Sequence, residues 1–133
     1  MKIGNIDHIA INIRDIQKSR DFYGRILGFK QLESVDCGEF ILHYFGLPNG
    51  SRLELFEYKV TQHTQAILDD DPGLRHLAFQ VTDVAAHEKE LRAAGVEITL
   101  PTCDLENLGA RVLLFLDPNG VTLEFCEKLT SLE

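Results

Sequence analysis

An internal repeat limits the folds open to this chain. The dipeptides Asn49-Gly50 and Asn119-Gly120 stand in equivalent surroundings, and residues 7–13 share their order of polar and apolar side chains with residues 75–81. A repeat of this kind predicts two copies of one supersecondary unit. At 133 residues, with 44% hydrophobic and 26% charged residues, the chain is expected to form one compact domain from two half-length modules.

The expected elements follow the same order in both halves. Asp15 and Asp83 are expected to cap helices over 16–27 and 84–93, which end at Gly28 and Gly95. Alternating apolar residues predict strands over 6–13, 29–35, 38–46 and 51–58, and again over 75–81, 96–99, 110–116 and 121–127. The resulting fold is α+β, with two βαβββ modules (about 1–60 and 74–128) that form a cup-shaped mixed sheet, and a linker with a short helix over about 61–73.

Composition excludes several classes of partner. A net charge of −8, from 13 basic and 21 acidic residues, disfavours nucleic acid. No segment approaches the roughly 20 apolar residues of a membrane span, and the first residues lack the apolar core of a signal peptide, so a cytoplasmic protein without a membrane partner is expected. The three cysteines are odd in number and lack a CxxC spacing, which predicts reduced thiols.

Each half offers one histidine and one glutamate, which makes four candidate metal ligands: His8, Glu54, His76 and Glu124. Side chains alternate across a strand, so His8 and His76 should face away from the isoleucines, leucine and phenylalanine that follow them. Glu54 and Glu124 should likewise face away from the leucines beside them. All four are therefore expected on the faces that the helices leave uncovered.

Two imidazoles and two carboxylates in one cavity are costly without a cation, because buried anions must be paired, protonated or metal-bound. Two nitrogen and two oxygen donors suit an octahedral site with two open positions, which favours Ni²⁺, Co²⁺, Mn²⁺ or Zn²⁺ over iron. The alternative is hydrogen-bonded core histidines with solvated glutamates. His43, His63 and His87 have no symmetric partner, and each is interpreted as an exposed or hydrogen-bonded histidine, while Glu57 is interpreted as solvated or linker-contacting.

These motifs resemble the vicinal oxygen chelate superfamily, which contains glyoxalase I, methylmalonyl-CoA epimerase, extradiol dioxygenases and the fosfomycin and bleomycin resistance proteins. The resemblance covers nearly the whole chain. It implies that the four residues named above bind the metal, in an order similar to that of bacterial glyoxalase I. Five segments carry it: Asp7-His8-Ile9-Ala10, residues 21–29, Leu53-Glu54-Leu55, residues 73–79 and residues 117–124.

The resemblance implies a metal-dependent lyase or isomerase that removes a proton α to a carbonyl, with a metal-stabilised enediolate. Glu124 is then the expected base and Glu54 its counterpart. Glyoxalase I usually anchors glutathione through an arginine and an asparagine, where this chain has Asn12 and Tyr58. Substrates expected from the resemblance are small 2-oxoaldehyde–thiol adducts or acyl thioesters. Candidate substrate-binding residues are Asn12, Phe56, Tyr58 and Arg111, with Arg52, Tyr44 and Cys126 as further cavity candidates.

Two other functions remain open at the level of sequence. An extradiol-type iron dioxygenase would use His8, His76 and Glu124, although Glu54 is unusual for that branch. A non-catalytic binder of the bleomycin-resistance type would bind a drug or other small molecule in the same cavity. A homodimer is expected, and the ligands could come from one chain or from two.

Overall fold

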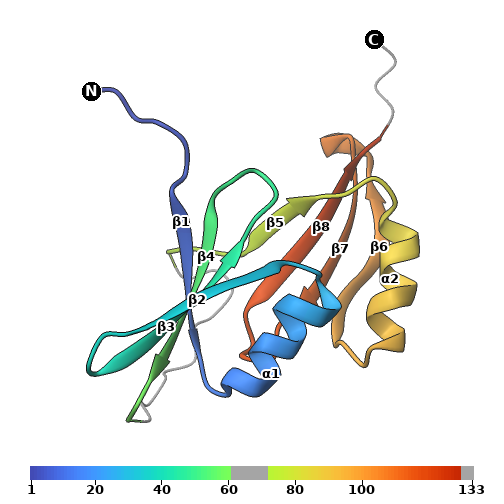
Figure 1. Cartoon of the computed structure of the whole chain (residues 1–133). Helices are drawn as coiled ribbons and strands as arrows, with labels where there is room; N and C mark the ends of the chain where they lie inside the picture. Colours follow the sequence, from blue (N-terminus) through green and yellow to red (C-terminus); the bar gives the residue numbers. More distant parts are fainter. Residues whose placement is uncertain (61–71, 130–133) are drawn as a thin grey trace. The chain divides into compact units, whose positions relative to one another are not determined.

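The computed structural model describes residues 1–60 and 72–129, which divide into two compact units, Met1–Gln65 and Ala66–Glu133. Each unit contains one four-stranded mixed sheet and its own helical segment, so the α+β class and the duplicated βαβββ order are confirmed (Figure 1). That the two modules make one domain stays a prediction. Most of the expected linker, residues 61–71, lies outside the described residues, as does His63.

Unit 1 is built around a sheet with strand order β1-β4-β3-β2. Strand β1 runs parallel to β4, while the two other pairings are antiparallel. The first strand of the module therefore lies beside its last strand, at one edge of the sheet. The strands are β1 (His8–Ile13), β2 (Lys30–Asp36), β3 (Phe40–Gly46) and β4 (Arg52–Tyr58).

The helical segment of unit 1 covers one face of this sheet. Asp15 caps α1 (Ile16–Arg20), because its side chain accepts hydrogen bonds from the backbone N–H groups of Gln17 and Lys18. A π-helix, η1 (Asp21–Ile26), continues α1, and Gly28 follows with a φ of 78°. The buried core of the unit lies under this segment and includes Phe22, Tyr23, Phe45, Leu53 and Leu55.

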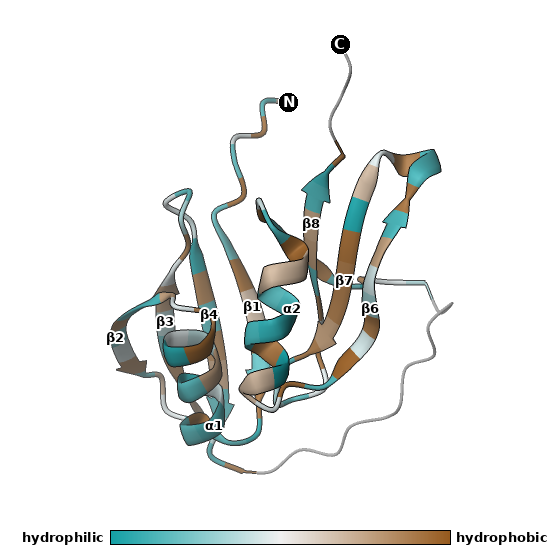
Figure 2. Ribbon diagram, turned by 90° about the vertical axis from the view of Figure 1, so that its right-hand side faces the viewer, coloured by the Kyte–Doolittle hydropathy of each residue, from teal (hydrophilic) through white to brown (hydrophobic). Residues whose placement is uncertain are grey.

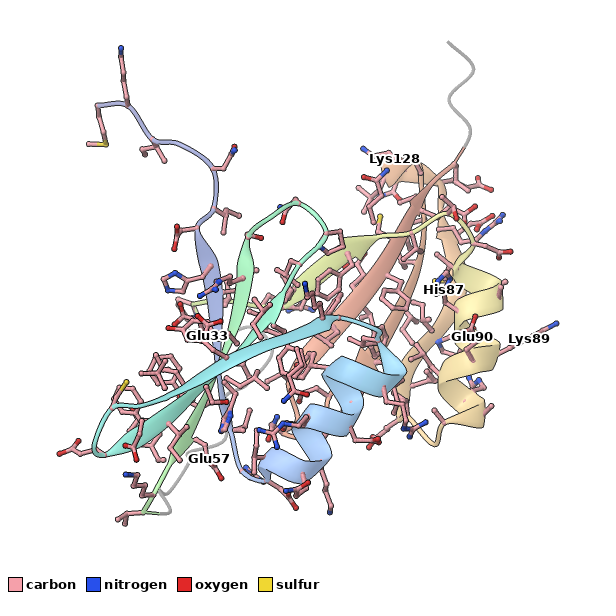
Figure 3. All side chains as sticks on the ribbon, in the orientation of Figure 1. Glu33, Glu57, His87, Lys89, Glu90 and Lys128 are labelled. Carbon is pink, nitrogen blue, oxygen red and sulfur yellow. The ribbon has the colours of Figure 1, made fainter. Side chains whose placement is uncertain are left out.

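Unit 2 repeats the arrangement with strand order β5-β8-β7-β6. Asp83 caps α2 (Val84–Ala93) through the N–H of Ala86, and Gly95 ends the turn after it with a φ of 80°. On α2, Lys89 extends away from the sheet of unit 2 (Figure 3). Strand β7 of that sheet consists mostly of hydrophobic residues (Figure 2). The other elements are β5 (Leu77–Gln80), β6 (Ile98–Leu105), the 3₁₀-helix η2 (Glu106–Leu108), β7 (Ala110–Leu116) and β8 (Thr122–Lys128).

The repeated turns explain why the Asn-Gly dipeptides recur. Gly50 and Gly120 have φ values of 89° and 86°, a region that side chains with a Cβ rarely adopt. Asn49 accepts hydrogen bonds from the N–H and hydroxyl of Ser51, and the buried Asp117 accepts from the N–H groups of Asn119 and Val121. Each turn therefore delivers the chain into the strand that carries a candidate glutamate.

Several expected boundaries were wrong in detail, and β1 and β3 each begin two residues later than expected. The helix expected over 16–27 changes from α to π geometry at Asp21. The strand expected over 96–99 instead spans Ile98–Leu105, and the strand expected over 75–81 is shortened to Leu77–Gln80, so His76 directly precedes it. Among the described residues, no helix is long and apolar enough to span a bilayer.

Candidate metal-binding pairs

The first candidate pair lies at the parallel edge of the unit 1 sheet. Glu54 on β4 is in register with Ala10 on β1, and His8 lies two residues before Ala10 on the same face. The Nδ1 atom of His8 is 3.4 Å from the Oε2 atom of Glu54. The carboxylate is largely enclosed, with 13% of its side chain exposed, whereas the imidazole is 43% exposed. Ile11, Leu53 and Leu55 point to the opposite, buried face, as alternation predicts.

Asp7 places a second carboxylate next to His8. Its Oδ2 atom lies 2.8 Å from Nδ1 of His8. This hydrogen bond, followed by the charge of Glu54, raises the pKa of His8 above its ordinary value. A carboxylate bound to one ring nitrogen orients the imidazole and leaves the other nitrogen available to a metal. The Asp-His dipeptide was visible in the sequence, but only the structure shows that the aspartate turns back to the ring.

The second candidate pair occupies the equivalent position in unit 2. Glu124 on β8 is in register with Ala78 on β5, and His76 again stands two residues before that alanine. The Nε2 atom of His76 is 2.7 Å from the Oε1 atom of Glu124. Their side chains are 27% and 15% exposed. The two pairs thus share one register, down to the alanine beside each glutamate.

Each pair resembles half of a metal site in its chemistry. A partly enclosed carboxylate beside an imidazole presents hard oxygen and nitrogen donors with no thiolate. Within the described residues, no group of three or more histidine, cysteine, aspartate or glutamate side chains is arranged so that it could hold a metal ion. The donor types of the two pairs agree with the donor set inferred from the sequence.

Most of the substrate-binding candidates lie on the same face of unit 1 as Glu54. Asn12 on β1 is in register with Phe56 on β4, and Tyr58 follows on the same face of that strand. Tyr44 on β3 is in register with Glu54 itself. The guanidinium of Arg52 lies 4.7 Å from the centre of the Tyr44 ring. Its Nη2 atom also donates to both carboxylate oxygens of Glu33, at 3.2 Å each.

Arg111 is not brought to Glu124. It is in register with Glu127 on β8, and so lies on the face of its sheet opposite to Glu124. Its guanidinium forms a two-point ion pair with Asp104, with a shorter contact of 2.6 Å. The alternation of β7 could have revealed this placement, because Arg111 shares a face with the buried Leu113 and Phe115. Arg111 therefore does not share a face with the candidate pair of unit 2, and its prediction as a residue on the Glu124 face was wrong.

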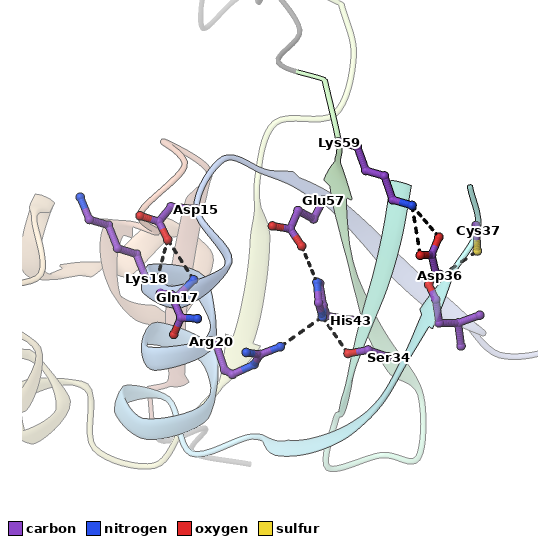
Figure 4. A network of polar contacts seen from close by, with 11 residues as sticks. Asp15, Gln17, Lys18, Arg20, Ser34, Asp36, Cys37, His43, Glu57 and Lys59 are labelled. Atoms are coloured by element: carbon purple, nitrogen blue, oxygen red, sulfur yellow. Dashed lines mark hydrogen bonds and ion pairs between the residues drawn. The ribbon is translucent and has the colours of Figure 1, made fainter. Parts of the chain in front are cut away.

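Glu57 and His43 form a separate network on the helix-covered face of unit 1 (Figure 4). His43 is buried, and its Nε2 atom lies 2.9 Å from Glu57, so the interpretation of Glu57 as solvated or linker-contacting was wrong. The Nδ1 atom of His43 lies 2.7 Å from the hydroxyl of Ser34 and 3.3 Å from Nη2 of Arg20. Because arginine can only donate, Nδ1 accepts and the Nε2–H group donates to Glu57.

The remaining histidine and cysteine predictions agree with the structure where it describes them. His87 contacts the backbone oxygen of Asp83 at 2.6 Å and packs its ring against Phe125, so it is a hydrogen-bonded histidine as expected. Cys37, Cys103 and Cys126 are free thiols. Cys126 lies on the face of β8 that carries Glu124, two residues further along the strand.

Comparison with known proteins supports the structural interpretation. The chain matches the family model described as the Glyoxalase/Bleomycin resistance protein/Dioxygenase superfamily over residues 5–125. It is 35% identical to the uncharacterized protein YwkD of Bacillus subtilis, covering 96% of this chain and 100% of that protein. It is 31% identical to the mitochondrial methylmalonyl-CoA epimerase of Dictyostelium discoideum, covering 95% and 80%.

A solved structure shows the same fold. The glyoxalase family protein from Enterococcus faecalis superimposes with a TM-score of 0.81 at 30% identity, covering 92% of this chain and 97% of that one. The family match over residues 5–125 includes all four candidate ligands. The chain therefore belongs to the glyoxalase, bleomycin resistance protein and dioxygenase superfamily.

Proposed function

We propose that this protein is a metal-dependent lyase or isomerase that removes a proton α to a carbonyl group. The observation that carries the proposal is the repeated histidine–glutamate pair, His8 with Glu54 and His76 with Glu124, at one register in two modules. A repeat that only maintained the fold would need to preserve the buried faces. Here it also preserves polar side chains on the opposite faces, where the core does not require them.

We further propose that both pairs bind one divalent metal, with four protein ligands and two open positions. Two nitrogen and two oxygen donors favour nickel, cobalt, zinc or manganese, with iron less favoured. The pairs would meet either within one domain of a single chain or between two chains of a homodimer. In both cases, the metal would balance the charge of two carboxylates that are mostly enclosed.

A bound divalent metal would act as a Lewis acid that stabilises negative charge on a substrate oxygen. Glu124 is assigned the role of base, accepting the proton from the carbon next to the carbonyl, and Glu54 is its counterpart in the other module. Both carboxylates are largely enclosed, with 13% and 15% of their side chains exposed, which limits the access of water to them. His8 and His76 would position the carboxylates through the contacts already present.

The proposed substrates are small 2-oxoaldehyde–thiol adducts or acyl thioesters. Similarity to a methylmalonyl-CoA epimerase supports the acyl thioester. The two positions at which glyoxalase I usually anchors glutathione hold Asn12 and Tyr58, which disfavours glutathione as the thiol. Asn12, Phe56 and Tyr58 are proposed instead to contact the substrate of this protein, because they share a face with Glu54.

The test measures bound metal and turnover together. Protein is stripped, reloaded from a mixed pool of divalent metals and dialysed, and its metal is then measured by plasma mass spectrometry. We expect about one equivalent of nickel, cobalt, zinc or manganese per chain. Turnover is then followed with hemithioacetals and acyl-CoA esters, and by exchange of the α proton with deuterated solvent.

The matched variant for this test is Glu124→Gln, with Glu127→Gln as the control on the opposite face of β8. Loss of proton exchange in Glu124→Gln alone would support the assignment of the base. Full turnover and full metal content in Glu124→Gln would show that the assignment is wrong. Retained iron with oxygen uptake on catechols would indicate a dioxygenase, and failure to retain any metal would contradict the proposal.

A further inference from the structure

Three aromatic rings form a cluster on unit 1 that the core does not require. Phe40 on β3 lies 4.9 Å from Phe56 and 5.4 Å from Tyr58, both on β4, measured between ring centroids. The rings of Phe56 and Tyr58 are 6.4 Å apart and inclined by 27°. Tyr58 is 40% exposed, whereas Tyr23 and Phe45, the aromatic side chains of the core, are completely buried. We call Phe40, Phe56 and Tyr58 the aromatic platform.

The aromatic platform continues the face that carries the candidate ligand pair. Phe40 is in register with Tyr58, and Phe56 follows Glu54 by two residues on the same strand. At the usual rise of a strand, Phe56 and Tyr58 lie roughly 7 and 13 Å along β4 from Glu54. Asn12 is in register with Phe56 and adds one amide beside the rings.

The face of the unit 1 sheet that carries the aromatic platform has charged side chains at the end away from the platform. His8, Arg52 and Glu54 gather there, with Arg52 held against Tyr44 and Glu33. A few polar groups at one end and aromatic side chains at the other are typical of a small-molecule site. The face would therefore suit an elongated ligand with a polar end near Glu54 and an apolar end on the platform.

The size of the platform favours a small molecule over a second protein. Aromatic side chains contribute about 150 to 250 Å² each when fully buried, and these three already cover part of one another. The area left is well below the roughly 800 Å² per partner that a stable protein interface buries. A single flat ring, by contrast, would be matched by the exposed surface of two or three aromatic side chains.

We propose that the aromatic platform binds a flat aromatic ring of the substrate. This inference rests on the proposed function, because it places the reacting carbonyl of that substrate next to Glu54. It narrows the substrate to an elongated carbonyl compound whose ring lies roughly 7 to 13 Å from the reacting carbon. Stacking and edge contacts with the three side chains would select a flat ring over an aliphatic group of similar size.

The platform is tested by binding, without reference to metal or turnover. Indole is titrated into ¹⁵N-labelled full-length protein, and amide chemical shifts are followed, with tert-butanol as the apolar probe that lacks a ring. We expect saturable shifts at β3 and β4 residues with indole and much weaker shifts with tert-butanol. Phe56→Leu, which keeps an apolar side chain, should bind indole about three- to tenfold more weakly. Leu108→Ala, an exposed apolar residue of unit 2, is the control and should leave binding unchanged.

Unchanged indole affinity in Phe56→Leu, or no saturable shifts at β3 and β4, would overturn the inference. So would sedimentation showing that Phe56→Leu converts a dimer to a monomer, because the rings would then cover a second copy of the chain. Indole binding that depends on Phe56 in protein that retains no metal would support the platform and contradict the metal-dependent reaction. Metal retention and turnover without such binding would overturn the platform alone.

Discussion

Asp7 distinguishes the two candidate pairs at the scale of single residues. Its carboxylate contacts Nδ1 of His8, whereas the residue before His76 is Arg75. Loss of a carboxylate that orients a metal-binding histidine lowers metal affinity in many sites. We expect Asp7→Asn to weaken metal binding by about tenfold, as measured by competition with a fluorescent chelator.

The control for Asp7→Asn is Asp21→Asn. Asp21 forms an ion pair with Arg25 on the surface of the same unit, away from both candidate ligands. Asp21→Asn removes one negative charge, as Asp7→Asn does, and should leave metal affinity unchanged. Equal weakening in the two variants would show that net charge, and not the orientation of His8, sets the affinity.

Strand alternation predicted the faces of the candidate glutamates but not the roles of all charged residues. Glu54 and Glu124 each stand between buried residues of one strand, so their direction follows from the period of two. Glu57 and Arg111 lie on helix-covered faces, where a charged residue is tolerated because His43 or Asp104 pairs with it. Such pairing depends on neighbouring strands and helices, which no local pattern in the sequence reveals.

At the scale of elements, the His43 network joins α1 to strands β2, β3 and β4 of its sheet. One buried imidazole meets Arg20, Ser34 and Glu57, each from a different element. His43→Ala would leave these partners without their hydrogen bonds, which costs about 2 kcal/mol or more in the free energy of unfolding. Urea unfolding followed by circular dichroism measures this loss.

His87→Ala is the matched control for the His43 substitution. His87 is only half-buried and contacts the backbone of its own helix. Its removal should cost less than about 1 kcal/mol. A similar loss of stability in the two variants would contradict the role assigned to the His43 network.

Glu88 connects α2 to β6, and its protonation should affect stability. Its carboxylate accepts from the hydroxyl and N–H of Thr102 and from Arg92, which lowers the pKa of Glu88 to about 2. A pKa lowered by folding gives stability that is present above the unfolded value near 4.5 and is lost as pH falls toward 2. We expect Glu88→Gln to cost about 2 kcal/mol at pH 7 and progressively less below pH 4.

The measurement for Glu88 is urea unfolding at pH 7, 4 and 3, with Glu90→Gln as the control. Glu90 is exposed on the same helix, so its substitution should have little effect at any of these pH values. If the difference between wild type and Glu88→Gln stayed constant with pH, the hydrogen bonds to the ionised carboxylate would not be its cause.

The elements themselves were predicted closely, and the misses have physical reasons. The caps at Asp15 and Asp83 lie where the sequence placed them. The π-helix from Asp21 was not predicted, because apolar spacing barely distinguishes i→i+4 from i→i+5 hydrogen bonds. Strand β6 continues through Pro101, which an edge strand tolerates because one side of it makes no ladder hydrogen bonds.

At the scale of the whole molecule, the proposed site requires both modules. If His8, Glu54, His76 and Glu124 hold one metal, then His8→Ala and His76→Ala should each reduce affinity at least tenfold. The measurement is bound metal per chain after dialysis at a fixed concentration of free metal. Variants that each retain half of the wild-type metal would show two independent sites, one per module.

Strand β1 lies beside β4, and β5 lies beside β8. This arrangement determines when each candidate pair forms during folding. Each histidine begins its module and each glutamate ends it, so their contact closes the longest loop within that module. Such a contact forms after the local hairpins, because its entropic cost grows with loop length. Neither pair can assemble on a nascent chain until its whole module has left the ribosome, so metal uptake would report that synthesis and folding of both modules are complete.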